Sequence, residues 1–268
     1  MSRACGAVFS DIDIRDYKAV CTTKGYSFPK EFELDTYRVK DQQDVGSCVA
    51  HALSSIIEYY NIKQRDDYTE MSTGYIYGNR TNSRHKDPGM VMRDALDIVA
   101  KYGDVTKQCF PYNVETPLAI KMYNKQAHDL FEVGLPNRIS EYCRITTVWA
   151  AKLSLMSGNP LLMAIEWYDD MSLDDNGVLH TNNVGYAGGH CMFIYGWDER
   201  GWKVQNSWGE EWGMNGKFIL PYNINIPECW SVIDNIIDGA CIKKPFKSKA
   251  GKIFAKIVNQ VCNTLRNK

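Results

Sequence analysis

The apolar residues that follow Ser47 recur every three or four positions, which predicts a helix with one buried face. Ser47 itself is suited to the N-cap of that helix. The same spacing predicts a second helix from about Met90 to Tyr102, and Gly103 would end it. The apolar positions of the first helix are Val49, Ala52, Leu53, Ile56, Ile57 and Tyr60. The first half of the chain is therefore expected to be mainly helical.

From about Ile145 the pattern changes to short apolar runs separated by glycine-containing turns, which is typical of strands. These runs are 161–167, 191–195, 202–205 and 217–220. The predicted fold is α+β with two lobes, in which a helical lobe faces an antiparallel, β-barrel-like lobe. A cleft between two such lobes is a usual place for a ligand site.

The chain has 268 residues, of which 44% are hydrophobic and 24% charged. This composition is typical of a globular protein with a substantial core. We expect four segments, which are an N-terminal arm or short leader at 1–36, the helical lobe at 37–140, the β lobe at 141–238 and a tail at 239–268.

The tail is distinguished by its charge. From Lys243 to the end there are eight basic residues and no acidic ones, while the net charge of the chain is −1. Its apolar residues fall on one helical stripe, which predicts a basic amphipathic helix. Such a helix would either pack on the body or contact an acidic partner, nucleic acid or a membrane surface.

The nine cysteines show neither a Cys-x-x-Cys motif nor metal-ligand spacing. We therefore expect mostly free thiols in a reducing compartment, with no metal and no cofactor. No apolar run approaches the ~20 residues that span a bilayer, and no signal peptide is recognisable. The expected location is cytoplasmic, or a virion or host-cell compartment if the protein is viral, and the expected state is a monomer.

Three residues suggest nucleophilic catalysis. Cys48 opens the first predicted helix, where unpaired backbone N–H groups and the helix dipole favour a thiolate. His190 follows a glycine pair and precedes an apolar strand, so its position would be well fixed. Asn206 can orient the imidazole without adding a charge. A buried structural cysteine is the alternative for Cys48, but the order Cys, His, Asn favours a nucleophile.

Acyl transfer also requires hydrogen-bond donors for the developing oxyanion. The backbone amide of Cys48 is one, and the side-chain amide of Gln42 or of Gln43 is the other, since spacing alone does not separate the two. Trp208 would shield the contact between His190 and Asn206 from water.

Several runs in the chain together resemble the papain-like cysteine peptidases, in particular the branch of bacteria and viruses that lacks a long propeptide. These runs are Asp41-Gln42, Cys48–Ala52, Asp87–Met90, Lys101–Gly103, Phe110–Tyr112, Gly189-His190, Asn206–Gly209, Trp212-Gly213 and Asn215-Gly216. They lie between about residues 37 and 235 and occur in the order expected for that family.

The resemblance implies a role for each matched residue. Cys48 would be the nucleophile, His190 the base and acid, Asn206 the orienting residue, and Gln42, in preference to Gln43, the oxyanion donor. The implied substrate wall is apolar and uncharged and accepts the second residue before the cleaved bond. Its residues are Gly89, Met90, Gly189, Cys191 and Trp208.

The expected activity is that of a cysteine endopeptidase acting on peptides or proteins through a thioester. One alternative is a transpeptidase or ligase that passes the same acyl group to an amine. The other is an inactive scaffold that only binds peptides, although the intact set of Cys, His, Asn and Gln argues against it. The chain departs from the secreted members at Val45, where they have a cysteine, and at Val49, where they have a tryptophan.

Overall fold

The computed structural model describes residues 4–14, 16, 18, 27–66, 68–80, 89–111 and 130–234. Residues up to Asp234 form one compact unit. The basic tail predicted from residue 239 lies outside the described residues, and so do parts of the N-terminal arm. The predicted boundary between two lobes at 140 and 141 stays a prediction.

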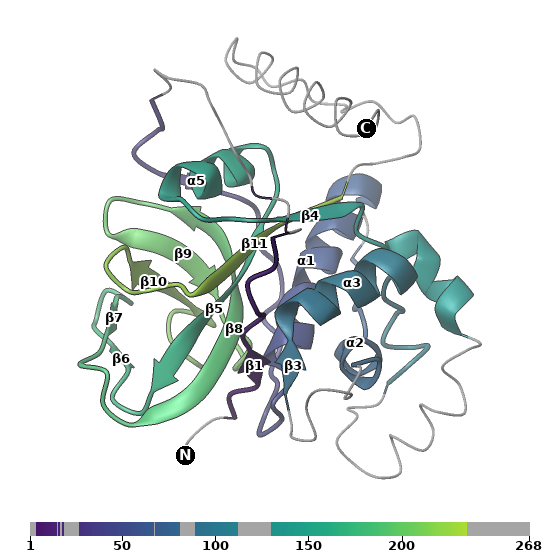
Figure 1. Cartoon of the computed structure of the whole chain (residues 1–268), viewed down its shortest axis with the longest axis horizontal. Helices are drawn as coiled ribbons and strands as arrows, with labels where there is room; N and C mark the ends of the chain where they lie inside the picture. Colours follow the sequence, from purple (N-terminus) through teal and green to yellow (C-terminus); the bar gives the residue numbers. More distant parts are fainter. Residues whose placement is uncertain are drawn as a thin grey trace. The chain divides into compact units, whose positions relative to one another are not determined.

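The helices of the first half are α1 (Cys48–Arg65), α2 (Thr73–Gly78) and α3 (Met92–Tyr102). They lie together beside the sheet (Figure 1). Both predicted helices are confirmed, and α3 ends at Gly103 as expected. Ser47 does occupy the N-cap position of α1, but its side chain does not cap the helix. Instead, its hydroxyl is hydrogen-bonded to Nδ1 of His51 at 3.1 Å.

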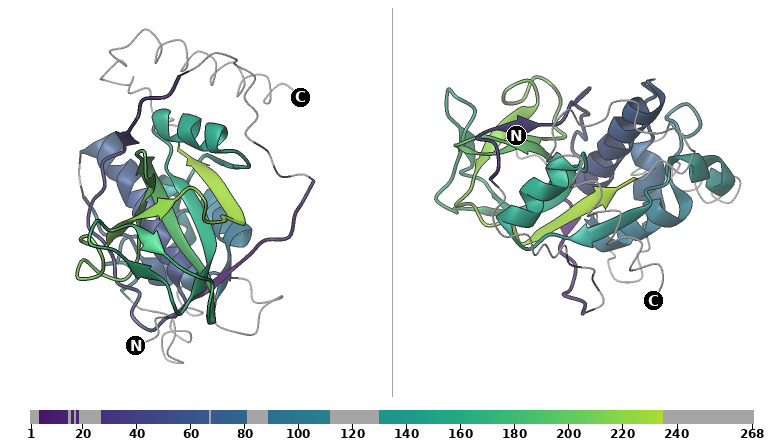
Figure 2. Two further views of the ribbon diagram at one scale, coloured as in Figure 1. Left: turned by 90° about the vertical axis from the view of Figure 1, so that its left-hand side faces the viewer. Right: turned by 90° about the horizontal axis from the view of Figure 1, so that it is seen from above.

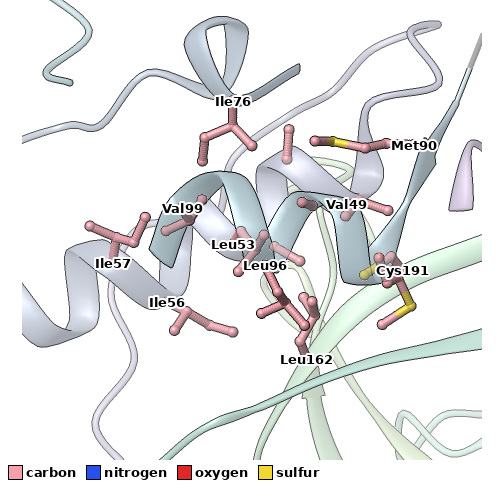
Figure 3. Packing of buried hydrophobic residues seen from close by; sticks show 14 of the residues in the cluster. Val49, Leu53, Ile56, Ile57, Ile76, Met90, Leu96, Val99, Leu162 and Cys191 are labelled. Carbon is pink, nitrogen blue, oxygen red and sulfur yellow. The ribbon is translucent and has the colours of Figure 1, made fainter. Parts of the chain in front are cut away.

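One hydrophobic core joins the helices to the sheet. Leu53 of α1 and Leu96 of α3 are fully buried and pack in the same cluster as Leu162 and Cys191 of the sheet (Figure 3). The sequence predicted one buried face for α1. Because α1 is covered by α2, α3 and the sheet, most of its residues are buried. The helix that begins at Cys48 is thereby held rigidly against the strands.

The main sheet has seven strands in the order β10-β9-β8-β5-β11-β4, with β2 paired to β8. Every pairing in it is antiparallel, as predicted. Its strands are β2 (Phe32–Glu33), β4 (Glu141–Arg144), β5 (Leu161–Tyr168), β8 (Tyr186–Trp197), β9 (Gly201–Gln205), β10 (Lys217–Pro221) and β11 (Glu228–Ile233). The strands β10 and β4 are not paired with each other, so among the described residues the sheet is open (Figure 2), and the barrel-like closure expected from the sequence is wrong.

The second half also contains α5 (Val148–Met156), which the sequence did not predict. Its residues are apolar on several sides, and Val148 is 52% exposed, so the segment lacks the spacing of an amphipathic helix. A local signal was nevertheless present, because Thr147 caps the helix by accepting the N–H of Ala150 at 3.1 Å. The remaining short elements are η1 (Leu135–Asn137), β6 (Ser172–Leu173) and β7 (Leu179–His180). None of the described helices is long and apolar enough to cross a membrane.

The N-terminal arm forms two short strands. β1 (Ala7–Val8) pairs in parallel with β3 (Met90–Val91), which directly precedes α3. β2 pairs with Gly196 and Trp197 at the end of β8. In Figure 1 the arm, drawn in dark purple, runs between the helices and the main sheet.

A buried ion pair fixes the segment that leads into α1. The Lys40 ammonium lies 2.6 Å from Oε1 of Glu58, and their side chains are 6% and 2% exposed. Glu58 also accepts the N–H of Met71 at 2.7 Å, and Lys40 donates to the Met71 carbonyl at 3.2 Å. Burial raises the pKa of Glu58, whereas Lys40 acts to lower it. The pair therefore ties the chain before the helix to the middle of α1.

Glu58→Ala is expected to lower the free energy of unfolding by about 3–5 kcal/mol, because it leaves the Lys40 ammonium buried without its partner. A second change, Lys40→Met, should restore much of that loss. The measurement is urea unfolding followed by circular dichroism. Lys107→Ala is the matched control, because it breaks an exposed pair with Glu70 and should change stability by less than about 1 kcal/mol. Equal losses in Glu58→Ala and Lys107→Ala would contradict the interpretation.

Candidate active site

Cys48 is the first residue of α1 and is fully buried. Its sulfur accepts the backbone N–H of Cys191 at 3.4 Å, and the amides of Gly6 and Val49 are also hydrogen-bonded to it. The sequence therefore placed this cysteine correctly at a helix start. The structure adds that the sulfur meets the strand that carries His190.

His190 lies on β8 and is fully buried. Its Nε2 is 2.7 Å from Oδ1 of Asn206, which directly follows β9. The Asn206 backbone N–H is held by the Gly216 carbonyl at 3.0 Å. Nδ1 of His190 makes no hydrogen bond. One imidazole nitrogen is thus fixed by Asn206, and the other is available for proton transfer.

Two indole rings surround this imidazole. Trp208 stacks on His190 with ring centroids 4.5 Å apart, and Trp167 meets it edge-on at 5.2 Å. Trp208 is only 4% exposed. It therefore covers the imidazole as the sequence suggested, and its place as a substrate contact stays a prediction.

Burial disfavours the charged forms of both the Cys48 thiol and the His190 imidazole. It raises the pKa of the Cys48 thiol, although the amides of Cys191, Gly6 and Val49 act in the opposite direction. It also lowers the pKa of His190 to about 4, and the hydrogen bond that the imidazole donates to Asn206 only partly offsets this. The lowered thiol pKa expected from the helix dipole is therefore wrong for this state of the molecule. In this state burial therefore disfavours the charged forms of both the thiol and the imidazole.

Gln42 is fully buried, whereas Gln43 is exposed. Oε1 of Gln42 accepts the Ser207 hydroxyl at 2.6 Å. Its Nε2 donates to the carbonyls of Val45 at 2.8 Å and Ala4 at 2.9 Å. The side-chain amide of Gln42 already donates to carbonyl oxygens, as an oxyanion donor must, whereas the side chain of Gln43 is exposed. The geometry therefore favours Gln42 over Gln43 as the oxyanion donor.

The residues expected to bind substrate line the path of the N-terminal arm. The N–H of Met90 donates to the Gly6 carbonyl at 2.8 Å, while the N–H of Gly89 is bonded to the Tyr77 hydroxyl at 3.1 Å. A Cβ on Gly189 would lie 2.2 Å from the Ala7 carbonyl oxygen. Glycine is thus required there for the close approach of the arm.

Cys191 differs from the other predicted wall residues. Its side chain is fully buried in the core beside Leu162 (Figure 3), and burial raises the pKa of its thiol well above the usual value. Only its backbone amide reaches the site. Cys109, in contrast, is exposed.

The sequence reasoning missed Glu228. Strand register aligns Glu228 with Ala164, and Ala164 with Cys191, so the three share the face of the sheet that packs on α1. Glu228 is 1% exposed, and its Oε2 accepts the N–H of Ser10 at 2.7 Å. Glu228 therefore lies on the same face of the sheet as Cys191, and the expectation of an apolar, uncharged substrate wall stays a prediction. The only signal was an acidic residue at the start of an apolar strand, which alone has no functional meaning.

Among the described residues no cluster of His, Cys, Asp or Glu could hold a metal ion. His51, one turn after Cys48, is buried and bonded to Ser47. The four predicted catalytic residues come together from separate parts of the chain. They form one buried cluster of a thiol, an imidazole and two amides.

Comparison with known proteins agrees with this arrangement. The sequence profile described as "papain family cysteine protease" matches residues 29–235. An uncharacterized peptidase C1-like protein of Acanthamoeba polyphaga mimivirus is 28% identical over 224 residues, covering 74% of this chain and 70% of the viral protein. Cathepsin B-like CP2 of Giardia intestinalis is 27% identical, covering 75% of this chain and 70% of that protein.

The fold is also shared with a solved structure. Xylellain, a cysteine protease from Xylella fastidiosa, superposes with a TM-score of 0.74 at 23% identity, covering 88% of this chain and 97% of xylellain. The fold, the family profile and the assembled thiol–imidazole site lead to the same conclusion. The chain belongs to the papain family of cysteine proteases.

Proposed function

We propose that this cysteine endopeptidase cleaves peptide bonds with Cys48 as nucleophile and His190 as base and acid. The observation that carries the assignment is the hydrogen bond that Nε2 of His190 donates to Oδ1 of Asn206, which leaves Nδ1 as the nitrogen that can exchange a proton. Nδ1 takes the thiol proton, and the sulfur attacks the substrate carbonyl carbon. If the site opens and water enters, the thiolate and the imidazolium become more favourable, because burial is what disfavours both charged forms.

The intermediate formed by this attack carries an oxyanion. Nε2 of Gln42 and the backbone amide of Cys48 would donate hydrogen bonds to it. When the C–N bond breaks, His190 returns the proton to the departing amine and a thioester remains on Cys48. Water then attacks the thioester, gives its proton to His190, and releases the acid and the free thiol.

We propose in addition that the protein works in a reducing compartment such as the cytoplasm. The support is that Cys109 presents a thiol on the surface, where an oxidising environment would modify it. The predicted contact of the basic tail with an acidic partner, nucleic acid or membrane surface also remains a proposal, which rests on its charge alone.

Cys48→Ser is expected to lower kcat/KM on a fluorogenic peptide by at least about 10³-fold, because the nucleophile is lost. An epoxide-type thiol-peptidase inhibitor should add one adduct, located on Cys48 by mass spectrometry of peptides. Cys109→Ser, which alters an exposed thiol, is the matched control and should retain full activity. Transfer of the acyl group to an added amine in preference to water would favour the ligase alternative, and absence of both adduct and turnover would favour the scaffold.

Gln42→Ala should lower kcat by about 10²-fold, because one oxyanion donor contributes about 2.7–4 kcal/mol to the transition state. The matched control is Gln43→Asn, which alters an exposed neighbour with φ of 54° and keeps a side chain that tolerates the left-handed region. Steady-state kinetics on a short peptide measure both. A large loss in Gln43→Asn with near-normal Gln42→Ala would reverse the assignment.

Glu228 is expected to let the site accept arginine or lysine as the second residue before the cleaved bond, besides apolar residues that contact Met90. Glu228→Gln should lower kcat/KM for an arginine substrate by about 10- to 100-fold relative to a leucine substrate, because a charge-assisted hydrogen bond is lost. Glu211→Gln, an exposed change, serves as control. An unchanged arginine-to-leucine ratio in Glu228→Gln would show that this carboxylate does not face the substrate.

A further inference from the structure

We propose that Trp167 is a positioning residue for His190, and that its ring face stabilises the protonated imidazole during peptide cleavage. The proposal rests on the function proposed above and deepens it, because it names a residue that acts through the catalytic base. Trp167 lies near the end of β5 and is 8% exposed. The sequence analysis placed it only as the last residue of an apolar run.

Strand register brings Trp167 to the face of the sheet that carries His190. β5 and β8 are antiparallel, with Ile165 paired to His190 and Trp167 paired to Gly188. Side chains two residues apart on a strand share a face, so Trp167 is the diagonal neighbour of His190. Ile165 and Trp167 pack in a second hydrophobic cluster, on the face of the sheet opposite to α1.

The rings of His190, Trp208 and Trp167 form a compact triangle. His190 and Trp208 are nearly parallel, with an interplanar angle of 22° and centroids 4.5 Å apart. Trp167 is nearly perpendicular to both, at 80° to the imidazole and 81° to Trp208, with centroids 5.2 and 4.8 Å away. A ring that is perpendicular to a stacked pair and close to both members lies beside the stack. At these separations it presents its face to their edges.

The edge of the imidazole that meets this ring face is a C–H edge. Nε2 of His190 donates to Asn206, and Nδ1 is the nitrogen left to exchange a proton with Cys48. When the imidazole is protonated, its C–H hydrogens share the positive charge, and an aromatic face attracts positive charge. The contact with Trp167 therefore favours the imidazolium over the neutral imidazole, against the effect of burial.

In the described part of the chain, no carboxylate is paired with His190. Burial lowers the pKa of this imidazole and the hydrogen bond to Asn206 raises it, without a contribution from a charged side chain. The titratable groups around the site are thiols, which belong to Cys48 at the start of α1 and to Cys5 of the N-terminal arm. The acidic residues on the neighbouring segments are exposed, and they are Glu166, Glu210 and Glu211. An aromatic face therefore has a larger part in stabilising the imidazolium.

The position of Trp167 is itself fixed by packing. Its indole also contacts Trp212 and Phe218 of β10, with ring centroids 6.3 and 6.5 Å away. Trp208 covers one face of the imidazole and Trp167 covers one edge. The imidazole cannot turn without displacing a packed indole, so Nδ1 keeps its direction.

The test measures kcat/KM against pH on a short uncharged peptide for the unmodified chain, Trp167→Leu and Trp167→Phe. Loss of the aromatic face should lower the pKa of His190, so the alkaline limb of the profile for Trp167→Leu should move to lower pH by about 0.5–1 unit. The acid limb, which reports ionisation of Cys48 beside an imidazolium, should stay in place. Trp167→Phe keeps an aromatic face and should keep most of the alkaline limb.

Trp202→Leu is the matched control, because Trp202 is 4% exposed in the same hydrophobic cluster and its ring contacts Tyr222. It should lower the thermal stability as Trp167→Leu does, without moving either limb. An NMR titration of the histidine ring nitrogens measures the pKa of His190 without turnover, and His190→Gln identifies the signal. In this titration Trp167→Leu should lower the pKa of His190 by the same amount.

A folded Trp167→Leu protein in which the alkaline limb and the pKa of His190 are unchanged would overturn the proposal, and so would an equal shift in Trp202→Leu. A lowered pKa of His190 by NMR, with no hydrolysis even by the unmodified chain, would support the contact but contradict the proposed peptidase chemistry. If Trp167→Leu does not fold, a fluorinated tryptophan placed at position 167 alone decides by the same criteria, because fluorine preserves the shape of the indole but weakens its attraction for positive charge.

Discussion

The geometry of the site depends on a set of hydrogen bonds that joins residues 40–42 to residues 207–209. The amide of Gln42 is held by the Ser207 carbonyl at 2.8 Å, and the amide of Gly209 by the Lys40 carbonyl at 3.0 Å. Ser207 also fixes the orientation of the Gln42 side chain. Because Asn206 directly precedes this link, the residues proposed to orient His190 and to bind the oxyanion are positioned by one short stretch of backbone. Precise placement of this kind is what acyl transfer requires.

Burial of Cys48 and His190 has an electrostatic consequence. The thiol and the imidazole are both excluded from water, so neither charge is favoured and the ion pair that would attack a substrate is suppressed. Part of that exclusion comes from the arm, whose backbone lies over Cys48 and along Met90. The arm therefore contributes to the burial that raises the pKa of Cys48 and lowers that of His190. Burial also explains why the pKa of the Cys48 thiol is raised although the residue lies at a helix start.

Similarity to other members lies mainly in the fold and in the groups around Cys48. The family profile begins at residue 29 and therefore does not include the part of the arm that crosses the cleft. Glycines at positions 89 and 189 leave room for the backbone of the arm, which approaches both of them closely. A site shaped to receive an extended peptide can be filled equally well by a segment of its own chain.

The sequence by itself determined the residue types and their order: a cysteine at a helix start, a histidine after a glycine pair and an asparagine before Ser-Trp-Gly. It also predicted α1, α3 and the antiparallel strands, because periodicity is a local property of the chain. It did not predict α5, whose apolar residues lack helical spacing, or the open edges of the sheet. The burial of Glu228 against the N–H of Ser10 and the passage of residues 4–10 over Cys48 were decided only by tertiary structure. Both depend on strand register and on contacts between residues more than 40 positions apart, which no local pattern encodes.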